Sequence, residues 1–261
     1  MTNTSAVRVK GLRKRYGART AVDGIDLDIP YGECFALLGP NGAGKTTTVE
    51  ILEGHRTKDG GEVLIGPKKD QIGIVLQEAA DAADLTVKEM VSHFASWYPN
   101  PRDALEVIEF VGLEPKKRVR TLSGGQRRRL DVAIGVVGRP RLLFMDEPTT
   151  GFDPEARRQF WALIRALEDT TILLTTHYLD EAEALADRVA VIVDGRIVAQ
   201  GDPRTLGGRA TAKATVRWKG GEEQTDDPVS FIRGTDEMLE ELTVTRPSLE
   251  DVYLDLIGAH R

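Results

Sequence analysis

Cysteine is almost absent from the sequence: Cys34 is the only one among 261 residues, so no disulfide can form within the chain. A disulfide-stapled secreted scaffold is therefore excluded, and a reducing compartment is expected. Long apolar runs are also missing, because stretches such as VAVIV at residues 189–193 fall far short of the ~20 residues that span a bilayer. The N-terminal MTNTSAVRVKGLRKRYG lacks the apolar centre of a secretory signal. We expect a cytosolic globular protein.

Positive charge is in deficit, since 35 Lys and Arg residues face 41 Asp and Glu residues and leave a net charge of −6 at pH 7. This balance argues against nucleic acid as a partner, because phosphate backbones select basic surfaces. Hydrophobic residues nevertheless make up 41% of the chain, which is too many for a disordered protein. The length suits one large core, alone or with a small appendage.

Apolar runs predict a buried parallel sheet. Five runs show no polar alternation, at residues 34–38, 72–76, 142–145, 172–175 and 189–193. Such runs are typical of strands that are covered on both faces. Helical periodicity over residues 155–168 and 179–186 separates several of them, while residues 7–9 and 25–29 alternate as half-buried antiparallel strands do. The sequence therefore predicts an α/β fold with a mixed sheet and an antiparallel β subdomain.

Three segments divide this pattern. Residues 78–140 have helical periodicity and no convincing strand, which predicts a helical insertion into a main domain of residues 1–206. Asp194-Gly195 lies between two apolar runs and predicts a hairpin with a type I′ turn. Gly207-Gly208 marks a boundary, after which residues 207–261 are expected to form a small α+β appendage.

The segment GPNGAGKT at residues 39–46 matches the pattern G-x-x-x-x-G-K-[ST] between a buried strand and a helix expected from Thr47 onward. The glycines turn backbone N–H groups toward one anion, and the helix N-terminus adds positive charge. Lys45 would reach the β- and γ-phosphates, and the Thr46 hydroxyl would ligate Mg²⁺. The alternative is a glycine-rich turn with an exposed lysine, but the strand-loop-helix context favours a nucleoside triphosphate. The expected binding residues are Gly39, Pro40, Asn41, Gly42, Ala43, Gly44, Lys45, Thr46 and Thr47.

An acidic pair follows the apolar run at residues 142–145. Asp146 is expected at the carboxyl edge of that strand, where ligands bind in open α/β sheets, and would hold Mg²⁺ directly or through water. Glu147 would orient or deprotonate an attacking water. The alternative is that Asp-Glu-Pro is a strand-ending turn, but its pairing with the phosphate loop favours the catalytic interpretation.

The hexapeptide LSGGQR at residues 122–127, taken with these two elements, resembles the signature motif of ATP-binding cassette (ABC) ATPases. As local structure it is a serine-capped helix start whose N–H groups would bond phosphate oxygens. The resemblance covers residues 7–206 and implies the P-loop ABC-ATPase fold, with ATP and Mg²⁺ as ligands. It also implies a nucleotide-dependent head-to-tail dimer, in which this loop closes over the γ-phosphate held by the other copy. The residues implied there are Ser123, Gly124, Gly125 and Gln126.

Further positions follow from the same resemblance. Tyr16 sits where the family stacks an aromatic ring on adenine, Gln77 resembles the Q-loop glutamine, and His177 matches the switch histidine at the γ-phosphate. Residues 150–154 resemble the D-loop that crosses the dimer interface, with Phe152 in place of the usual leucine. The implied catalytic residues are Glu147, His177 and Gln77, and the implied metal ligands are Thr46, Gln77 and Asp146.

Two more stretches point to what hydrolysis drives. TTHYLDEAE at residues 175–183 and RPSLEDVYL at residues 246–254 resemble the daunorubicin-resistance type of multidrug exporter. In that type the ATPase and the membrane permease are separate chains, which implies export of a drug-like, antibiotic or lipid substrate from the cytoplasmic face of the membrane. An importer ATPase, or a soluble ABC ATPase without a transport role, is the alternative.

The permease contact is expected within residues 78–101. The apolar side chains there include Leu85, Val87, Phe94, Trp97 and Tyr98. Exposed aromatics would mark a docking patch, whereas buried ones would be the core of the helical insertion. The sequence leaves both interpretations open. The stretch at residues 248–254 also predicts a helix with Ser248 as N-cap and Asp251 as the capping acid.

Overall fold

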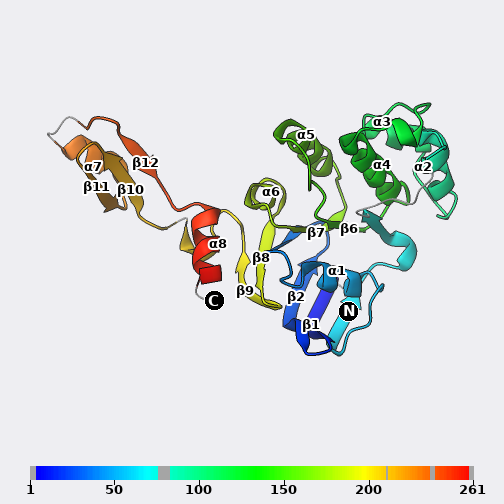
Figure 1. Ribbon diagram of the computed structural model, residues 1–261, viewed down its shortest axis with the longest axis horizontal. Helices are drawn as coiled ribbons and strands as arrows, with labels where there is room; N and C mark the ends of the chain where they lie inside the picture. The colour runs from blue at the N-terminus through cyan, green and yellow to red at the C-terminus, as the bar shows by residue number, and fades with distance from the viewer. Residues whose placement is uncertain (1–3, 76–82, 210, 236–238, 259–261) are drawn as a thin grey trace.

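The computed structural model describes residues 4–75, 83–209, 211–235 and 239–258, and its centre is a six-stranded mixed sheet (Figure 1). In spatial order the strands are β5 (Ile72–Val75), β6 (Leu142–Asp146), β7 (Thr171–Thr176), β3 (Cys34–Leu38), β8 (Arg188–Val193) and β9 (Arg196–Gly201). The first five run parallel and β9 pairs antiparallel with β8. Each predicted apolar run forms one of the parallel strands, so the predicted fold class is confirmed.

Successive residues of the parallel strands enter two different cores, as the two-residue period of a strand requires. In β3, Phe35 and Leu37 face the core shared with the antiparallel sheet, whereas Ala36 and Leu38 face the core shared with the helices. Both faces of the parallel strands are therefore covered by apolar cores, which explains why these strands show no polar alternation. The β8–β9 hairpin turns at Asp194 and Gly195, whose φ values of 46° and 78° are those of the predicted type I′ turn.

A second sheet of three antiparallel strands covers one face. Its order is β2 (Arg19–Pro30), β1 (Ser5–Tyr16) and β4 (Gly60–Ile65). The predicted strands at residues 7–9 and 25–29 are the centres of β1 and β2, but both strands are longer. The sequence analysis missed β4, because its half-exposed sequence GGEVLI carries little apolar alternation.

Helices α2 (Val87–Ala95), α3 (Ala104–Phe110) and α4 (Gly124–Val137) pack on one another at one end of the molecule, within the stretch predicted to be helical (Figure 1). Helix α5 (Pro154–Arg165) begins one residue before its predicted range because Asp153 caps it, accepting from the N–H groups of Glu155 and Ala156. It ends three residues earlier than predicted, with Ala166 at its C-cap. Helix α6 (Leu179–Leu185) contacts α5 and lies over β3 and β7.

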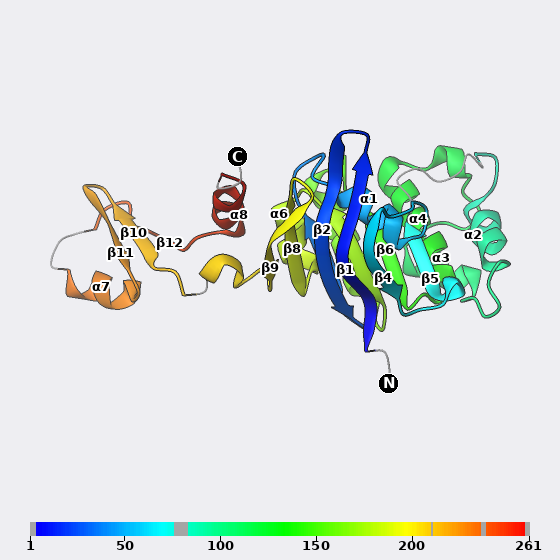
Figure 2. The same ribbon diagram turned by 90° about the horizontal axis from the view of Figure 1, so that it is seen from below.

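The C-terminal region forms a third small sheet that stands apart from the other two (Figure 2). Its strands are β10 (Ala214–Trp218), β11 (Gly221–Thr225) and β12 (Thr243–Thr245), with helices α7 (Pro228–Gly234) and α8 (Leu249–Gly258). Helix α8 returns to α6 and starts with the predicted cap, since the Asp251 N–H donates to Ser248 Oγ at 3.1 Å. The described part of the chain also contains the 3₁₀ turns η1 (Lys69–Gln71), η2 (Val119–Thr121) and η3 (Leu206–Gly208). In the described ranges, every helix is too short or too polar to cross a bilayer.

Candidate functional site

A cavity of about 500 Å³ lies beside the segment that joins β3 to α1 (Lys45–Leu52). Its lining residues are Tyr16, Arg19, Ala21, Asn41, Gly42, Gly44, Lys45, Thr46, Thr47 and Glu147. The structure therefore brings the predicted adenine-stacking tyrosine, most of the phosphate loop and the predicted catalytic glutamate to one place. Arg19 was missed by the sequence analysis, although its guanidinium Nη2 donates to the Gly42 carbonyl at 2.9 Å. The only sequence signal was a cation three residues after the tyrosine.

The phosphate loop needs glycine where it passes the antiparallel sheet. Gly44 has a φ of 106°, and a Cβ there would lie 2.2 Å from the carbonyl oxygen of Ala21. Gly44 is also the N-cap of α1, so the helix begins at Lys45 and not at Thr47 as predicted. The N–H groups of a first helical turn have no intrahelical acceptor, which leaves those of Lys45, Thr46 and Thr47 available to an anion at this cavity.

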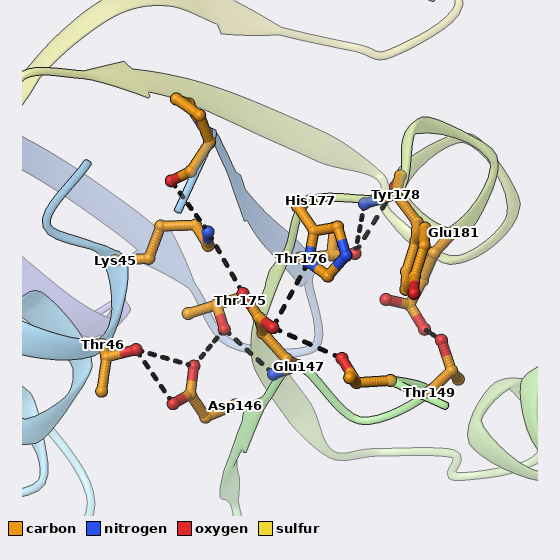
Figure 3. A network of polar contacts seen from close by, with 12 residues as sticks. Lys45, Thr46, Asp146, Glu147, Thr149, Thr175, Thr176, His177, Tyr178 and Glu181 are labelled. Atoms are coloured by element: carbon orange, nitrogen blue, oxygen red, sulfur yellow. Dashed lines mark hydrogen bonds and ion pairs between the residues drawn. The ribbon is translucent and has the colours of Figure 1, made fainter. Parts of the chain in front are cut away.

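Lys45 is almost fully buried, with 4% of its surface exposed. Its Nζ donates to the Gly39 carbonyl at 2.8 Å and to the Pro40 carbonyl at 3.2 Å, and it lies 3.2 Å from Glu147 Oε1 (Figure 3). Two loop carbonyls and one carboxylate therefore hold the ammonium at the cavity wall, where it would meet the phosphates of a nucleotide.

Asp146 ends β6 at the carboxyl edge of the sheet, as predicted. The Thr46 hydroxyl donates to its Oδ2 at 3.1 Å, and the Thr175 hydroxyl donates to its Oδ1 (Figure 3). A hydroxyl and a carboxylate at one point fit Mg²⁺, which takes one or two protein oxygens and completes its shell with water and phosphate. The third predicted ligand, Gln77, lies outside the described residues.

Glu147 follows in a left-handed backbone conformation, with a φ of 44°. Its N–H lies 3.1 Å from both the carbonyl and the hydroxyl oxygen of Thr175, to which it donates. Its Oε2 lies 3.3 Å from Nδ1 of His177 (Figure 3). That nitrogen is buried and has no aligned hydrogen bond within the described ranges. Partial burial acts to raise the pKa of Glu147, but the charges of Lys45 and His177 outweigh it and lower the pKa. The carboxylate is therefore ionised at neutral pH, as a general base must be.

The signature residues lie at a different cavity, of about 540 Å³, at the start of α4. Ser123, Gly124 and Gly125 line it together with residues 150–153 of the predicted D-loop. Ser123 caps α4, and Gln126 returns the contact, since its Oε1 accepts from the Ser123 N–H at 3.2 Å and from Lys117 Nζ at 2.8 Å. Within one chain the structure does not bring these residues to Lys45.

Four further residues line the signature cavity and had no role in the sequence analysis: Arg127, Arg128, Asp131 and Ala156. Asp131 is 4% exposed, and its Oδ1 is buried without a hydrogen bond in the part of the chain that the structure describes. Burial raises the pKa of Asp131 to about 6, against the opposing charges of Arg128 and Arg127. The sequence signal was one acid among the apolar residues that follow LSGGQRRR.

The predicted permease-contact residues divide between the two interpretations. Val87 is fully buried, and Leu85, Phe94 and Tyr98 pack against the helical core. Trp97 is 64% exposed, while its ring lies 4.8 Å from that of Phe94 and 5.3 Å from that of His93. These four residues therefore belong to the core of the helical insertion, whereas Trp97 presents an aromatic ring at its surface.

Residues 22–150 match the ABC transporter family. The Nod factor export ATP-binding protein I of Ralstonia nicotianae is 44% identical over 222 residues, which cover 78% of this chain and 69% of that protein. The chain belongs to the ABC transporter ATP-binding proteins. The predicted family, fold class and transport-coupled ATPase activity are thereby confirmed.

Two other similarities support this membership. The daunorubicin/doxorubicin resistance ATP-binding protein of Streptomyces peucetius is 44% identical over 216 residues, which cover 76% of this ABC protein and 66% of that one. The solved structure of cbiO1 from Clostridium perfringens, described as part of the ABC transporter complex cbiONQ, superposes with a TM-score of 0.70 at 29% identity. The match covers 77% of this chain and 90% of the cbiO1 chain.

Proposed function

We propose that this chain is the ATP-hydrolysing subunit of an ABC exporter, in which two copies each hold one ATP with Mg²⁺ in the Lys45 cavity. The carrying observation is the convergence of Lys45, Glu147 and His177 at the end of the phosphate loop, with Lys45 Nζ and His177 Nδ1 within 3.3 Å of the Glu147 carboxylate. A cation, an ionised base and an imidazole at one point are the groups that phosphoryl transfer to water needs.

In the proposed reaction a water oxygen attacks the γ-phosphorus of ATP while the bond to the β,γ-bridging oxygen breaks, which releases ADP. Glu147 accepts the proton of that water, and His177 contacts the γ-phosphate oxygens. Lys45 moves its ammonium from Glu147 to the β- and γ-phosphates, and Tyr16 stacks on the adenine. Thr46, Asp146 and Gln77 would hold Mg²⁺, whose charge offsets that of the phosphates.

The second copy would supply Ser123. The signature residues and the phosphate loop line separate cavities of one chain, which is what a head-to-tail pair requires. The N-terminus of α4 offers N–H groups and positive charge to a γ-phosphate held by the other copy. Because the two ionised glutamates oppose each other across such a pair, we expect a monomer without nucleotide and a transient dimer with Mg²⁺ and ATP.

The transported substrate would be a drug-like, antibiotic or lipid molecule, which is exported through a separate membrane permease. The names of two relatives, one for Nod factor export and one for daunorubicin/doxorubicin resistance, favour export. Trp97 offers an exposed aromatic surface on the helical insertion for the permease, which would hold the protein at the cytoplasmic face of the membrane. Nucleic acid is not expected as a partner, because the chain is acidic.

The test is the Glu147→Gln variant, with Glu62→Gln at an exposed strand position as its control. We expect Glu147→Gln to bind ATP as the wild type does and to hydrolyse it at least ~100-fold more slowly, because it lacks the general base. Light scattering should show its mass double with Mg²⁺ and ATP. Near-normal turnover would remove Glu147 from this role, and an unchanged mass would contradict the dimer.

Export is tested by purification from detergent-solubilised membranes. Recovery together with an integral membrane chain supports the exporter assignment. Recovery alone, or with soluble proteins only, contradicts it. The direction of transport is read from inside-out vesicles, where export appears as ATP-dependent uptake of a labelled drug or lipid.

A further inference from the structure

Glu181 is a fully buried carboxylate in the first turn of α6, outside the Lys45 cavity. Its Oε1 accepts a hydrogen bond from the Thr149 hydroxyl at 2.7 Å and another from the indole Nε1 of Trp161 at 3.3 Å. Figure 3 places Glu181 and Thr149 against each other on the side of Glu147 away from Lys45. Burial of a carboxylate costs free energy unless hydrogen bonds compensate for the lost water. The hydrogen-bond partners of Glu181 therefore indicate its role.

Thr149 is itself fully buried and follows Glu147 by two residues. The turn between them is strained, because Glu147 has a positive φ, which a residue with a Cβ adopts less readily than glycine. Such a conformation persists only when the surroundings hold both ends of the turn. Thr175 holds the first end, through the bond from the Glu147 N–H to its carbonyl, and Glu181 holds the second through Thr149.

The segment that carries His177 leads directly into α6, the helix of Glu181. Glu181 follows this histidine by four residues, because His177 stands directly before Tyr178, the N-cap of α6. The Thr176 hydroxyl in turn accepts from the Tyr178 N–H at 2.9 Å (Figure 3). The Thr149–Glu181 bond therefore joins the turn after Glu147 to the helix that starts directly after the turn around His177.

Burial raises the pKa of Glu181, and the nearby hydroxyls of Thr176 and Thr149, the indole of Trp161 and the charge of Arg157 oppose that rise. Its Oε2 is buried and has no hydrogen-bond partner in the described residues. An apolar side chain would fill this position without that penalty. The polar contacts, and not the packing, therefore account for an acid here.

We propose that Glu181 is a positioning residue for ATP hydrolysis, whose hydrogen bond to Thr149 sets the distance between Glu147 and His177. The proposal rests on the role proposed for Glu147 above. It predicts that loss of the Thr149–Glu181 bond lowers turnover and leaves nucleotide affinity unchanged, because neither residue lines the nucleotide cavity.

The experiment compares Thr149→Val, which removes the hydroxyl at nearly constant volume, with Thr149→Ser, which keeps it. We expect Thr149→Val to lower kcat about ten-fold at unchanged KM for ATP, because a small displacement of a catalytic group is enough for such a loss, and Thr149→Ser to restore kcat. Trp161→Phe is the matched control, since it removes a donor from the same carboxylate but leaves the Thr149–Glu181 bond in place. Its kcat should stay within about two-fold of the wild type.

A double-mutant cycle separates the contact from general destabilisation. In a Glu181→Ala background, Thr149→Val should lower kcat by less than about two-fold, because the bond is already absent. Three outcomes overturn the proposal: normal kcat in Thr149→Val, an equal loss in Trp161→Phe, or full additivity in the cycle. If Glu147→Gln also turns over normally, the role of Glu147 has failed; if Glu147→Gln is inactive and Thr149→Val is normal, only the role of Glu181 has failed.

Discussion

Lys45 Nζ lies 3.2 Å from Glu147 Oε1, so the cation of the phosphate loop and the carboxylate at the end of β6 are paired across the cavity. Both groups are largely buried, which makes the pair stronger than a surface ion pair. A triphosphate bound in the cavity would compete with Glu147 for the same ammonium. Nucleotide binding would then release the carboxylate toward the water that it has to activate.

Replacement of Lys45 by methionine tests the first half of this exchange. We expect ATP affinity to fall about 10- to 100-fold, since charged hydrogen bonds contribute about 1.5–3 kcal/mol and each 1.4 kcal/mol is ten-fold. Equilibrium titration with a fluorescent ATP analogue measures the affinity. The matched control is Lys88→Met, at an exposed position of α2 away from the cavity. Equal affinity in Lys45→Met and Lys88→Met would contradict a phosphate contact by Lys45.

Asp131 makes the stability of the chain depend on pH. Its pKa of about 6 in the folded state lies above the ~3.9 of an unfolded aspartate, so the folded state binds the proton more tightly. Stability therefore falls as the pH rises from about 4 to about 6, and the full penalty remains above that window.

Asp131→Asn removes this penalty, although it also gives up the attraction of Arg128, which lies 3.8 Å away. We expect the variant to be more stable than the wild type by about 1 kcal/mol at pH 8 and by almost nothing at about pH 4. Urea denaturation at the two pH values measures the difference. Asp70→Asn, at an exposed position, is the control and should show no gain at either pH. The same gain at both pH values would argue that the effect is not protonation.

Substitutions at Trp97 and Val87 distinguish the proposed docking surface from the core of the helical insertion. Because Trp97 is 64% exposed, Trp97→Ala should change the free energy of unfolding by less than about 0.5 kcal/mol. Val87→Ala should lower it by about 2 kcal/mol, because Val87 is fully buried. Urea denaturation checks both values.

The Trp97→Ala variant also tests permease binding. Less permease should be recovered with this variant than with the wild type, while the basal ATP hydrolysis of the variant should remain at the wild-type rate. Permease recovery equal to that of the wild type would show that Trp97 is not part of the contact. A large stability loss in Trp97→Ala would show that its ring belongs to the core.

Much of the fold could be predicted because its signals are local. Five strands buried on both faces appear as uninterrupted apolar runs, and the phosphate loop is a contiguous motif between a strand and a helix. Strand β4 was not predicted, because an edge strand with half-exposed residues has neither an apolar run nor clean alternation. The start of α1 was misplaced by two residues, because the left-handed Gly44 that caps it is imposed by the nearby Ala21 carbonyl, which no local pattern contains.

The amino-acid sequence by itself determined the chemical groups of this protein: a cation on a glycine loop, two acids after a buried strand, and a histidine after the next strand. Tertiary structure alone decided which of them touch. Lys45 meets Glu147 because β3, β7 and β6 are neighbours in the sheet, and Thr149 meets Glu181 because α6 packs beside the turn that follows β6. Contacts of this kind join residues far apart in the chain, so they follow from strand order and helix packing and not from any local pattern.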